Sequence, residues 1–277
     1  QICEGTYSPL KHFMNLSEIN SVLENFCLIT GESWTLPIMF QISEDLAKTL
    51  PASGEILVKR RIDGKIYGVL NIIKIEPLGP IEKLARKFFG TDDKNHPGVK
   101  RFYESGNYLL SGKPYLIERP FFGIDSSYEL TPSQVRSIFN ECGWRKVIGF
   151  HTRNMIHRGH ECIQKIALEK SNADALFISP VGGKKKKGDF SSKVILACCE
   201  ILIREGRFAP FGALLGTFST YPRYSGPREA VFTALCRKNF GCEGFIVGRD
   251  HTGVGNYYDP DESIRIFDKV DTGLDII

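Results

Sequence analysis

The side chains best suited to chemistry in this 277-residue chain lie within residues 151–160. This segment holds an arginine, Arg153, and two histidines, His157 and His160. An apolar run at 147–150 precedes it and a segment with helical periodicity follows, so a strand leads into a helix that begins at these residues. Free backbone N–H groups and the helix dipole make such a turn an anion site. The segment therefore indicates a site for a polyphosphate.

The two histidines also have other interpretations. Residues three apart share a helix face, so His157 and His160 could bind a metal ion or serve only in packing. The chain has no HExxH motif and no obvious third ligand, which disfavours zinc. Gly159 between them would allow a ligand to approach the backbone closely. We therefore expect phosphate contact and no protein-bound metal.

Three further segments have the composition of binding loops. A four-lysine run, including Lys186 and Lys187, lies between glycines, which favours a mobile cationic flap over a triphosphate, although such runs are commonly solvated faces or nuclear addresses. Gly226 and Pro227 open a helix, which is also their ordinary structural role. The third segment resembles a binding loop more than a salt-bridged turn, and it contains Gly248, Arg249, Asp250, His251 and Thr252.

The second half of the chain alternates between strand and helix patterns. We expect strands near 146–150, 175–179, 211–218 and 244–247, and helices near 133–140, 157–170, 191–205 and 227–239. Alternation of this kind predicts parallel strands joined by right-handed crossovers, with ligands bound beyond the carboxyl ends of the strands. Each of the four segments above follows one of these strands. They should therefore meet at one edge of one sheet.

The first half has the pattern of a small mixed β domain. Residues 55–70 predict a hairpin with a two-residue turn at Asp63 and Gly64, and a second β segment follows at 71–75. Short helices are expected at 42–50, capped by Ser43, and at 81–89, ended by Gly90. The junction near 126–132 divides the chain into domains 1–127 and 128–277.

Composition narrows the class of protein. Hydrophobic residues make up 42% and charged residues 25%, with a net charge of +4, as expected for a globular protein that is less basic than most nucleic-acid binders. The sequence shows no signal peptide and no run of about 18 apolar residues, so we expect no membrane segment. The eight cysteines form no Cys-x-x-Cys pair, which favours buried thiols in the cytoplasm. Neither a P-loop nor a G-x-G-x-x-G motif occurs.

Taken together, the motifs resemble those of the ATP sulfurylase family of HxGH nucleotidyltransferases. Residues 151–160 resemble the family's Q-T-R-N-P-x-H-R-x-H, 224–228 its Y-A-G-P-R, and 248–253 its G-R-D-H-A-G. Residues 34–38, 89–93 and 96–99 resemble its PUA-like N-terminal domain. The resemblance implies an α/β fold, a Rossmann-like parallel sheet with flanking helices, preceded by a smaller PUA-like mixed β domain.

The resemblance also implies an activity and residue roles. The family transfers AMP from ATP to sulfate, giving adenosine 5′-phosphosulfate and pyrophosphate, with Mg²⁺ accompanying ATP. Arg153 would hold the oxyanion, Asn154 the α-phosphate, His157 and His160 the phosphates, and Arg249 would neutralise the reacting groups. His151, Thr152, the two lysines, Gly226 and residues 248–252 would line the substrate site. We also expect a homo-oligomer, and a larger chain that includes an adenylylsulfate kinase is compatible with the sequence.

Three positions depart from the family pattern. His151 replaces a glutamine that donates to sulfate, Met155 replaces a proline, and Thr252 replaces an alanine whose backbone approaches sulfate. A histidine can donate to an oxyanion, but its charge varies near neutral pH. These departures leave two alternatives open. One is a nucleotidyltransferase of the same fold that uses another oxyanion or a phosphorylated acceptor, and the other is a PUA-like RNA-binding module with a relic nucleotide site.

Overall fold

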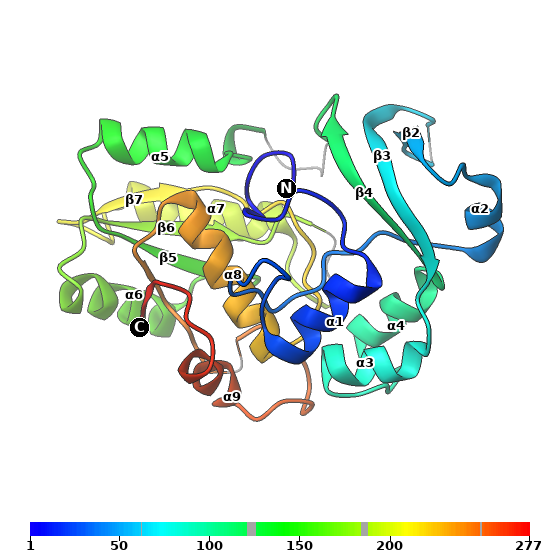
Figure 1. Cartoon of the computed structure of the whole chain (residues 1–277). Coiled ribbons are helices and arrows are strands. Elements are labelled where there is room, and N and C mark those ends of the chain that lie inside the picture. The colour runs from blue at the N-terminus through cyan, green and yellow to red at the C-terminus, as the bar shows by residue number, and fades with distance from the viewer. Residues whose placement is uncertain (62, 121–125, 184–187, 250) are drawn as a thin grey trace.

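The computed structural model describes residues 1–61, 63–120, 126–183, 188–249 and 251–277. Figure 1 shows an N-terminal region built around strands β2, β3 and β4, beside an α/β region that contains β5, β6 and β7. None of the helices in the described ranges combines the length and the apolar character needed to cross a lipid bilayer.

The N-terminal sheet is antiparallel, with strand order β1-β4-β3-β2. Its strands are β1 (Gln41–Ile42), β2 (Gly54–Lys59), β3 (Ile66–Pro77) and β4 (Tyr108–Leu116). The predicted hairpin is confirmed, but β3 runs without a break through the segment expected as a separate strand. The predicted two-residue turn is wrong, because Lys59 pairs with Ile66 and the connection spans 60–65. Gly64 does have the positive φ, 69°, that the sequence indicated.

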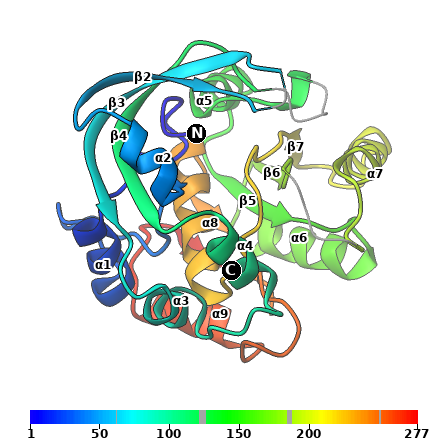
Figure 2. The same ribbon diagram turned by 90° about the vertical axis from the view of Figure 1, so that its right-hand side faces the viewer.

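Four helices accompany this sheet: α1 (Leu16–Asn25), α2 (Glu44–Thr49), α3 (Ile81–Phe89) and α4 (Pro97–Glu104). Figure 2 shows α1, α3 and α4 together at one end of the β2–β4 sheet. The predicted caps are confirmed, since Ser43 accepts a hydrogen bond at the start of α2 and Gly90 ends α3 in the left-handed conformation. Two helices were not predicted: α1, which begins with a capping box formed by Asn15 and Glu18, and α4, whose cap is a histidine, His96, rather than a typical capping residue.

The C-terminal region is a five-stranded parallel sheet with strand order β7-β6-β5-β8-β9. Its strands are β5 (Val147–Thr152), β6 (Ala175–Pro180), β7 (Gly212–Leu215), β8 (Gly244–Phe245) and β9 (Asp275–Ile276). The helices are α5 (Pro132–Glu141), α6 (Arg158–Lys170), α7 (Ser192–Arg204), α8 (Pro227–Phe240) and α9 (Glu262–Arg265). The predicted alternation is confirmed. Strands β7 and β8 are shorter than predicted, because the pairing with the neighbouring strand ends before the predicted last residue. The chain then enters the loops described below.

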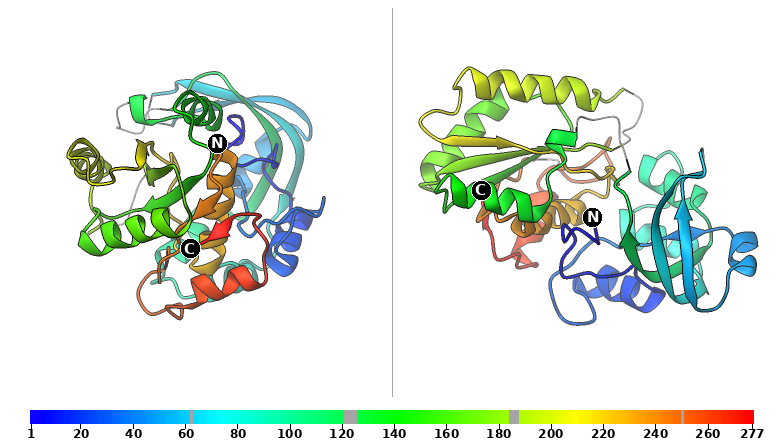
Figure 3. Two further views of the ribbon diagram at one scale, coloured as in Figure 1. Left: turned by 90° about the vertical axis from the view of Figure 1, so that its left-hand side faces the viewer. Right: turned by 90° about the horizontal axis from the view of Figure 1, so that it is seen from above.

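Side-chain alternation along β5 and β6 separates the two helix layers. Ile148 and Ile178 pack with residues of α6 and α7, whereas Val147 and Phe177 pack with residues of α5 and α8. Figure 3 shows the sheet between these helices. Because successive strand residues point to opposite faces, the last residues of β5 also point alternately toward α8 and toward α6.

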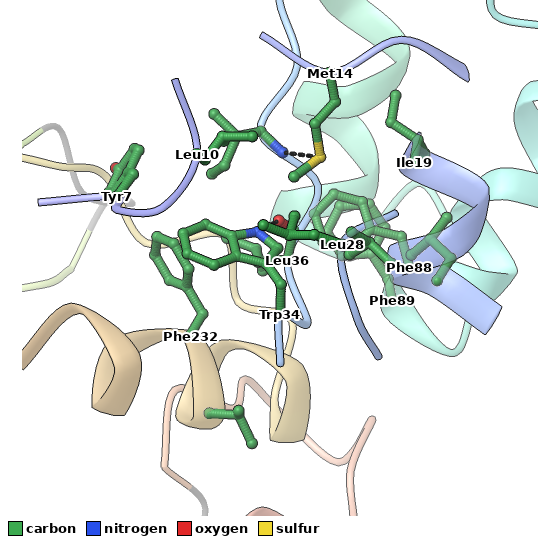
Figure 4. Packing of buried hydrophobic residues seen from close by; sticks show 14 of the residues in the cluster. Tyr7, Leu10, Met14, Ile19, Leu28, Trp34, Leu36, Phe88, Phe89 and Phe232 are labelled. Atoms are coloured by element: carbon green, nitrogen blue, oxygen red, sulfur yellow. Dashed lines mark hydrogen bonds between the residues drawn. The ribbon is translucent and has the colours of Figure 1, made fainter. Parts of the chain in front are cut away.

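The largest hydrophobic cluster joins the two halves of the chain. Figure 4 shows Trp34 and Tyr7 packed against Phe232 of α8, with ring centroids 5.7 and 5.2 Å from the Phe232 ring. The Thr35 hydroxyl also donates to the backbone oxygen of Arg228 at 2.6 Å. The first forty residues therefore brace the start of α8, where one of the candidate loops lies.

Candidate active site

Loops that follow β5, β7 and β8 meet at one edge of the parallel sheet. The Arg153 guanidinium, after β5, donates to the backbone oxygen of Gly253, after β8, at 2.6 Å. The same guanidinium lies 5.3 Å from the centre of the Tyr224 ring, which belongs to the loop after β7. The structure thus brings three of the four segments into contact around Arg153.

Arg153 is held in place yet retains an unused donor. The bond to Gly253 and the contact with Tyr224 fix the guanidinium plane, whereas Nη1 is buried and has no hydrogen-bond partner among the described residues. A fixed guanidinium presents its donors in the geometry of an oxyanion. An anion bound here would satisfy Nη1.

The histidine pair forms the start of α6. His157 is the N-cap, and its Nδ1 accepts a hydrogen bond from the Gly159 backbone N–H at 3.1 Å. The His157 and His160 rings stack with their centroids 3.8 Å apart. Burial, followed by the nearby His157, lowers the pKa of His160, although the Met155 backbone opposes the shift. His160 Nδ1 is buried without a hydrogen-bond partner in the described part of the chain, so it too is available to a ligand.

Thr152 and Asn154 shape the turn between β5 and α6. The Thr152 hydroxyl accepts from the Asn154 backbone N–H at 3.0 Å and lies 2.9 Å from the Asn154 carbonyl oxygen. The side chain of Thr152 is therefore engaged with the turn itself, whereas Asn154 is exposed to solvent. Thr152 supports the loop, and Asn154 has access to a ligand.

His151 faces α8, where it meets an arginine that sequence reasoning missed. Arg237 is fully buried, and its Nη2 donates to His151 Nδ1 at 2.8 Å and to the Ser179 backbone oxygen at 3.0 Å. Burial lowers the pKa of Arg237 to about 10, so the group stays charged at neutral pH. The next residue, Lys238, is also basic and lies in the same predicted helix. No local signal in the sequence indicated that Arg237 would be the buried residue of the two.

His251, in the loop after β8, lies beside His151, and Thr252 follows it in the chain. The His251 and His151 ring centroids are 5.5 Å apart. Burial, helped by the charges of Arg237 and Arg153, lowers the pKa of His251 to about 3, which keeps this ring neutral. The Thr252 hydroxyl is 3.0 Å from the Gly226 backbone oxygen and 2.6 Å from the His251 backbone oxygen. The departure from alanine thus links two loops instead of placing a hydroxyl toward the acceptor.

The fold requires glycine at one of the two glycine positions predicted for the site, but not at the other. Gly226 has φ +54°, and a Cβ there would lie 2.7 Å from ring atoms of Tyr258. The position therefore excludes any side chain. A Cβ on Gly248 would meet nothing within 4 Å, so only close approach of a ligand could require glycine there.

Arg249 points away from the cluster around Arg153. Its side chain is 74% exposed and pairs with Asp261 at 3.2 Å. An exposed pair of this kind contributes little to stability and leaves the guanidinium free to reorient. In this conformation Arg249 pairs with Asp261 and not with the loops that meet at Arg153.

Lys186, Lys187 and Asp250 lie outside the described residues. The segment that contains the lysines is nevertheless attached at both ends to the loop after β7. The Gly183 backbone N–H donates to the Thr220 oxygen at 2.8 Å, and the Tyr224 hydroxyl donates to Asp189 at 3.1 Å. The Asp189 end of this segment thereby contacts the tyrosine that lies against Arg153, and the Gly183 end contacts the same loop at Thr220.

A second residue missed from the sequence supports that tyrosine. His96 is buried, and its Nδ1 accepts from the backbone N–H groups of Gly98 and Val99. Its proton must therefore lie on Nε2, which donates to the Tyr224 backbone oxygen at 2.9 Å. Tyr224 has φ +60°, an unusual value for a bulky residue, so this bond from the N-terminal half stabilises a conformation that the site requires.

Family models match both halves of the chain. Residues 126–277 match the ATP-sulfurylase family, and residues 1–119 match a PUA-like domain. The PUA-like match covers the antiparallel sheet, and the ATP-sulfurylase match covers the parallel sheet with all of its loops.

Similar proteins share this assignment along almost the whole chain. A sulfate adenylyltransferase of Synechococcus sp. (strain JA-3-3Ab) is 40% identical over 268 residues, which cover 97% of this chain and 67% of that protein. The sulfate adenylyltransferase of Pyrococcus abyssi is 41% identical, with coverage of 97% and 68%. The chain thus spans about two thirds of the length of these relatives.

A solved structure has the same fold. A hexameric APS kinase from Thiobacillus denitrificans superposes with a TM-score of 0.71 at 19% identity, covering 100% of this chain and 49% of that one. At this identity the likeness concerns the fold alone. The relatives and the two family models carry the assignment: the chain belongs to the ATP-sulfurylase family and is a nucleotidyltransferase of the sulfate adenylyltransferase type.

Proposed function

We propose that this chain joins ATP and sulfate at the edge of the parallel sheet, forming adenosine 5′-phosphosulfate and releasing pyrophosphate. The observation that carries the proposal is the buried, unpartnered Nη1 of Arg153, a charged donor held at the meeting point of three loops. The names of the relatives, at about 40% identity, support the same reaction.

The two anions would bind on either side of the turn after β5. We assign sulfate to Arg153 and His151, which lie on the α8 side with His251. We assign the phosphates of ATP to the start of α6, with Asn154, His157 and His160, where the helix dipole and the free Nδ1 of His160 favour negative charge. The walls of the site would come from Thr152, Gly226, Gly248, His251 and Thr252, and from Lys186, Lys187 and Asp250.

The reaction requires positioning and neutralisation rather than a protein nucleophile. A sulfate oxygen attacks the α-phosphorus, the bond to the bridging oxygen of pyrophosphate breaks, and its electron pair leaves with pyrophosphate. No proton needs to move. Arginine donors suit this task because both reactants are anions that repel one another. In this scheme Arg249 would leave Asp261 and turn toward the reacting groups when both substrates are bound.

Mg²⁺ would enter with ATP. The donors around Arg153 are guanidinium, imidazole and hydroxyl groups, which suit anions, and the described residues contain no cluster of three side chains able to ligate a metal. The buried carboxylate Glu229 already accepts from the backbone N–H groups of Arg223 and Ser225. The phosphate oxygens of ATP would therefore supply most of the ligands, and the ion would supply further neutralisation of the triphosphate.

Pyrophosphate release tests the proposal directly. Purified protein with ATP, Mg²⁺ and sulfate should release pyrophosphate, and omission of sulfate should abolish the release. Folded protein that releases none would contradict the proposal. Release that depends on another tetrahedral oxyanion or a phosphorylated acceptor, and not on sulfate, would identify the acceptor as different.

The organisation of the protein follows as further proposals. We propose domains 1–127 and 128–277, a homo-oligomer and a cytoplasmic location, in which all eight cysteines would stay unpaired as they are here. The expectation that the thiols are buried is wrong for five of them, because only Cys199, Cys236 and Cys242 are buried. Helices α6 and α7 cover the same face of the sheet, and each carries exposed apolar side chains, Ile163 and Ile166 on α6 and Val194 and Ile201 on α7. Light scattering at micromolar concentration would report the oligomeric state.

A further inference from the structure

We infer that Arg237 is a positioning residue that holds His151 as the neutral tautomer protonated on Nε2, so that His151 acts as a permanent hydrogen-bond donor. The tautomer follows from the hydrogen bond between the two residues. The consequence for catalysis rests on the proposed function, in which His151 donates to the acceptor anion.

The donor and acceptor types leave one arrangement for the ring. Arg237 Nη2 lies 2.8 Å from His151 Nδ1. A guanidinium has five N–H donors and no acceptor, so Nδ1 must offer its lone pair. A neutral imidazole whose Nδ1 accepts carries its proton on Nε2. Protonation of Nδ1 would bring two N–H groups head to head and place two positive charges side by side.

Arg237 has no freedom to move away from His151. The residue is fully buried, its Nη2 is also tied to the Ser179 backbone oxygen, and its guanidinium lies 4.3 Å from the centre of the Phe218 ring. The side-chain stem packs against Gly149, where a Cβ would come within 3.1 Å of both Arg237 Cβ and Cγ. Gly149 therefore makes room for the arginine inside the sheet–helix interface.

No carboxylate of the described residues neutralises the Arg237 guanidinium. A buried arginine without an ion pair is costly, so its retention points to a role beyond stability. Two other ionisable groups of the described residues act in the same direction. His251 is uncharged at neutral pH, and Arg153 on the adjacent loop adds a second positive charge. The charges of Arg237 and Arg153 thus oppose protonation of the His151 ring.

The arrangement gives a physical reason for a histidine at this position. An amide side chain, as the family pattern has here, donates an N–H at any pH. A histidine matches this only when one ring nitrogen always carries the proton and the other never does. Arg237 enforces that condition on His151. The departure from the family pattern then preserves a donor toward the acceptor anion instead of abolishing it.

Two-bond ¹H–¹⁵N correlation spectra of protein labelled at histidine nitrogen distinguish the two neutral tautomers from the charged ring. His151→Gln identifies the His151 signals by their loss. We expect the Nε2–H pattern in the unsubstituted protein across the range of about pH 6 to 8, in which a free histidine would titrate. A signal for the Nδ1–H tautomer or for a charged ring at neutral pH would overturn the inference. This measurement needs no variant of Arg237.

A double-mutant comparison tests the consequence for the reaction. Arg237→Met should raise KM for sulfate by at least about tenfold, because it frees the ring to turn or charge and weakens one hydrogen bond to an anion. In the His151→Gln background the same substitution should change KM by less than about threefold, because an amide needs no fixed tautomer. Arg237→Lys, which keeps a donor without an acceptor, should restore most of the affinity. Equal losses in both backgrounds would show that Arg237 acts only through structure and would refute the positioning role.

The two readouts separate this inference from the proposed function. If sulfate supports no pyrophosphate release while the spectra show Nε2–H, the proposed reaction fails and the tautomer assignment stands. If release is normal and the spectra show another form, the assignment fails alone. Should Arg237→Met not fold, the spectra of the unsubstituted protein and the Arg237→Lys kinetics still decide the matter.

Discussion

Replacement of Arg153 by alanine is the most direct test of the site. The substitution removes the buried Nη1 donor, whose partner in the transition state would be the sulfate that attacks ATP. One preorganised charged donor is worth about 3 kcal/mol in transition-state stabilisation, which predicts a loss of about 100-fold or more in kcat/KM for sulfate. The kcat/KM of Arg153→Lys should lie between those of Arg153→Ala and the unsubstituted protein. One ammonium group cannot bond to Gly253 and to the anion in the geometry of a guanidinium.

The loss in activity should exceed the loss in stability. Arg153 contributes one hydrogen bond to a backbone oxygen and one contact with the Tyr224 ring, in a partly exposed position. Such contacts together are worth about 1–2 kcal/mol, which in a chain of this size lowers Tm by only a few degrees. The variant should therefore be folded in the assay.

Steady-state release of pyrophosphate with varied sulfate measures the effect. Arg60→Ala serves as the matched control, since Arg60 forms an exposed ion pair with Asp63 in the hairpin of the N-terminal sheet and its removal should change kcat/KM little. If Arg153→Ala keeps more than about a third of the kcat/KM of the unsubstituted protein, the effect is below 1 kcal/mol and the assignment of Arg153 to the acceptor is wrong.

Three other perturbations should give defined results. Tyr258→Phe removes a hydroxyl that lies 2.9 Å from the backbone oxygens of both Phe89 and Tyr224. The free energy of unfolding should therefore fall by about 1–2 kcal/mol. An unchanged denaturation midpoint would contradict the contact. Thr252→Ala should cost about 1 kcal/mol or less in stability and leave KM for sulfate within threefold, because the hydroxyl links loops and does not face the acceptor. Acid should destabilise the fold: the pKa of His251 is about 3 when folded and 6.5 when exposed, so the unfolded state binds the extra proton and stability falls as the pH drops from about 6.5 toward 3. Between pH 7 and pH 4.5 the free energy of unfolding should fall by about 2 kcal/mol more in the unsubstituted protein than in His251→Gln. An equal fall in both proteins would exclude His251 as the cause.

Local signals in the sequence predicted several elements that begin or end at a strong capping residue. Helix α5 starts at Pro132 with Thr131 as cap, and α3 ends at Gly90, as expected from residue type alone. Such signals did not suffice everywhere, because α1 begins with a capping box formed by Asn15 and Glu18 and was missed. Other elements that were missed have weaker signals. Helix α4 begins with a histidine cap, and the short strand β9 is defined by its pairing with β8 some 30 residues away in the chain.

The amino-acid order by itself predicted that four polar segments follow four strands of one parallel sheet and meet at one edge, and the structure brings three of them into contact. The amino-acid order also determined the family, because three motifs occur in order with the right elements between them. Both conclusions depend on residue types and on spacing along the chain, which the sequence records directly.

Only the tertiary structure decided what each polar group does there. It placed the buried Arg237 against His151 and His96 against Tyr224, pairs that are 86 and 128 residues apart. It also showed that the Thr252 hydroxyl contacts Gly226 and that Arg249 faces Asp261. The tautomer, charge and orientation of a side chain depend on the partners that folding brings to it. Those partners come from distant segments, and no local pattern specifies them.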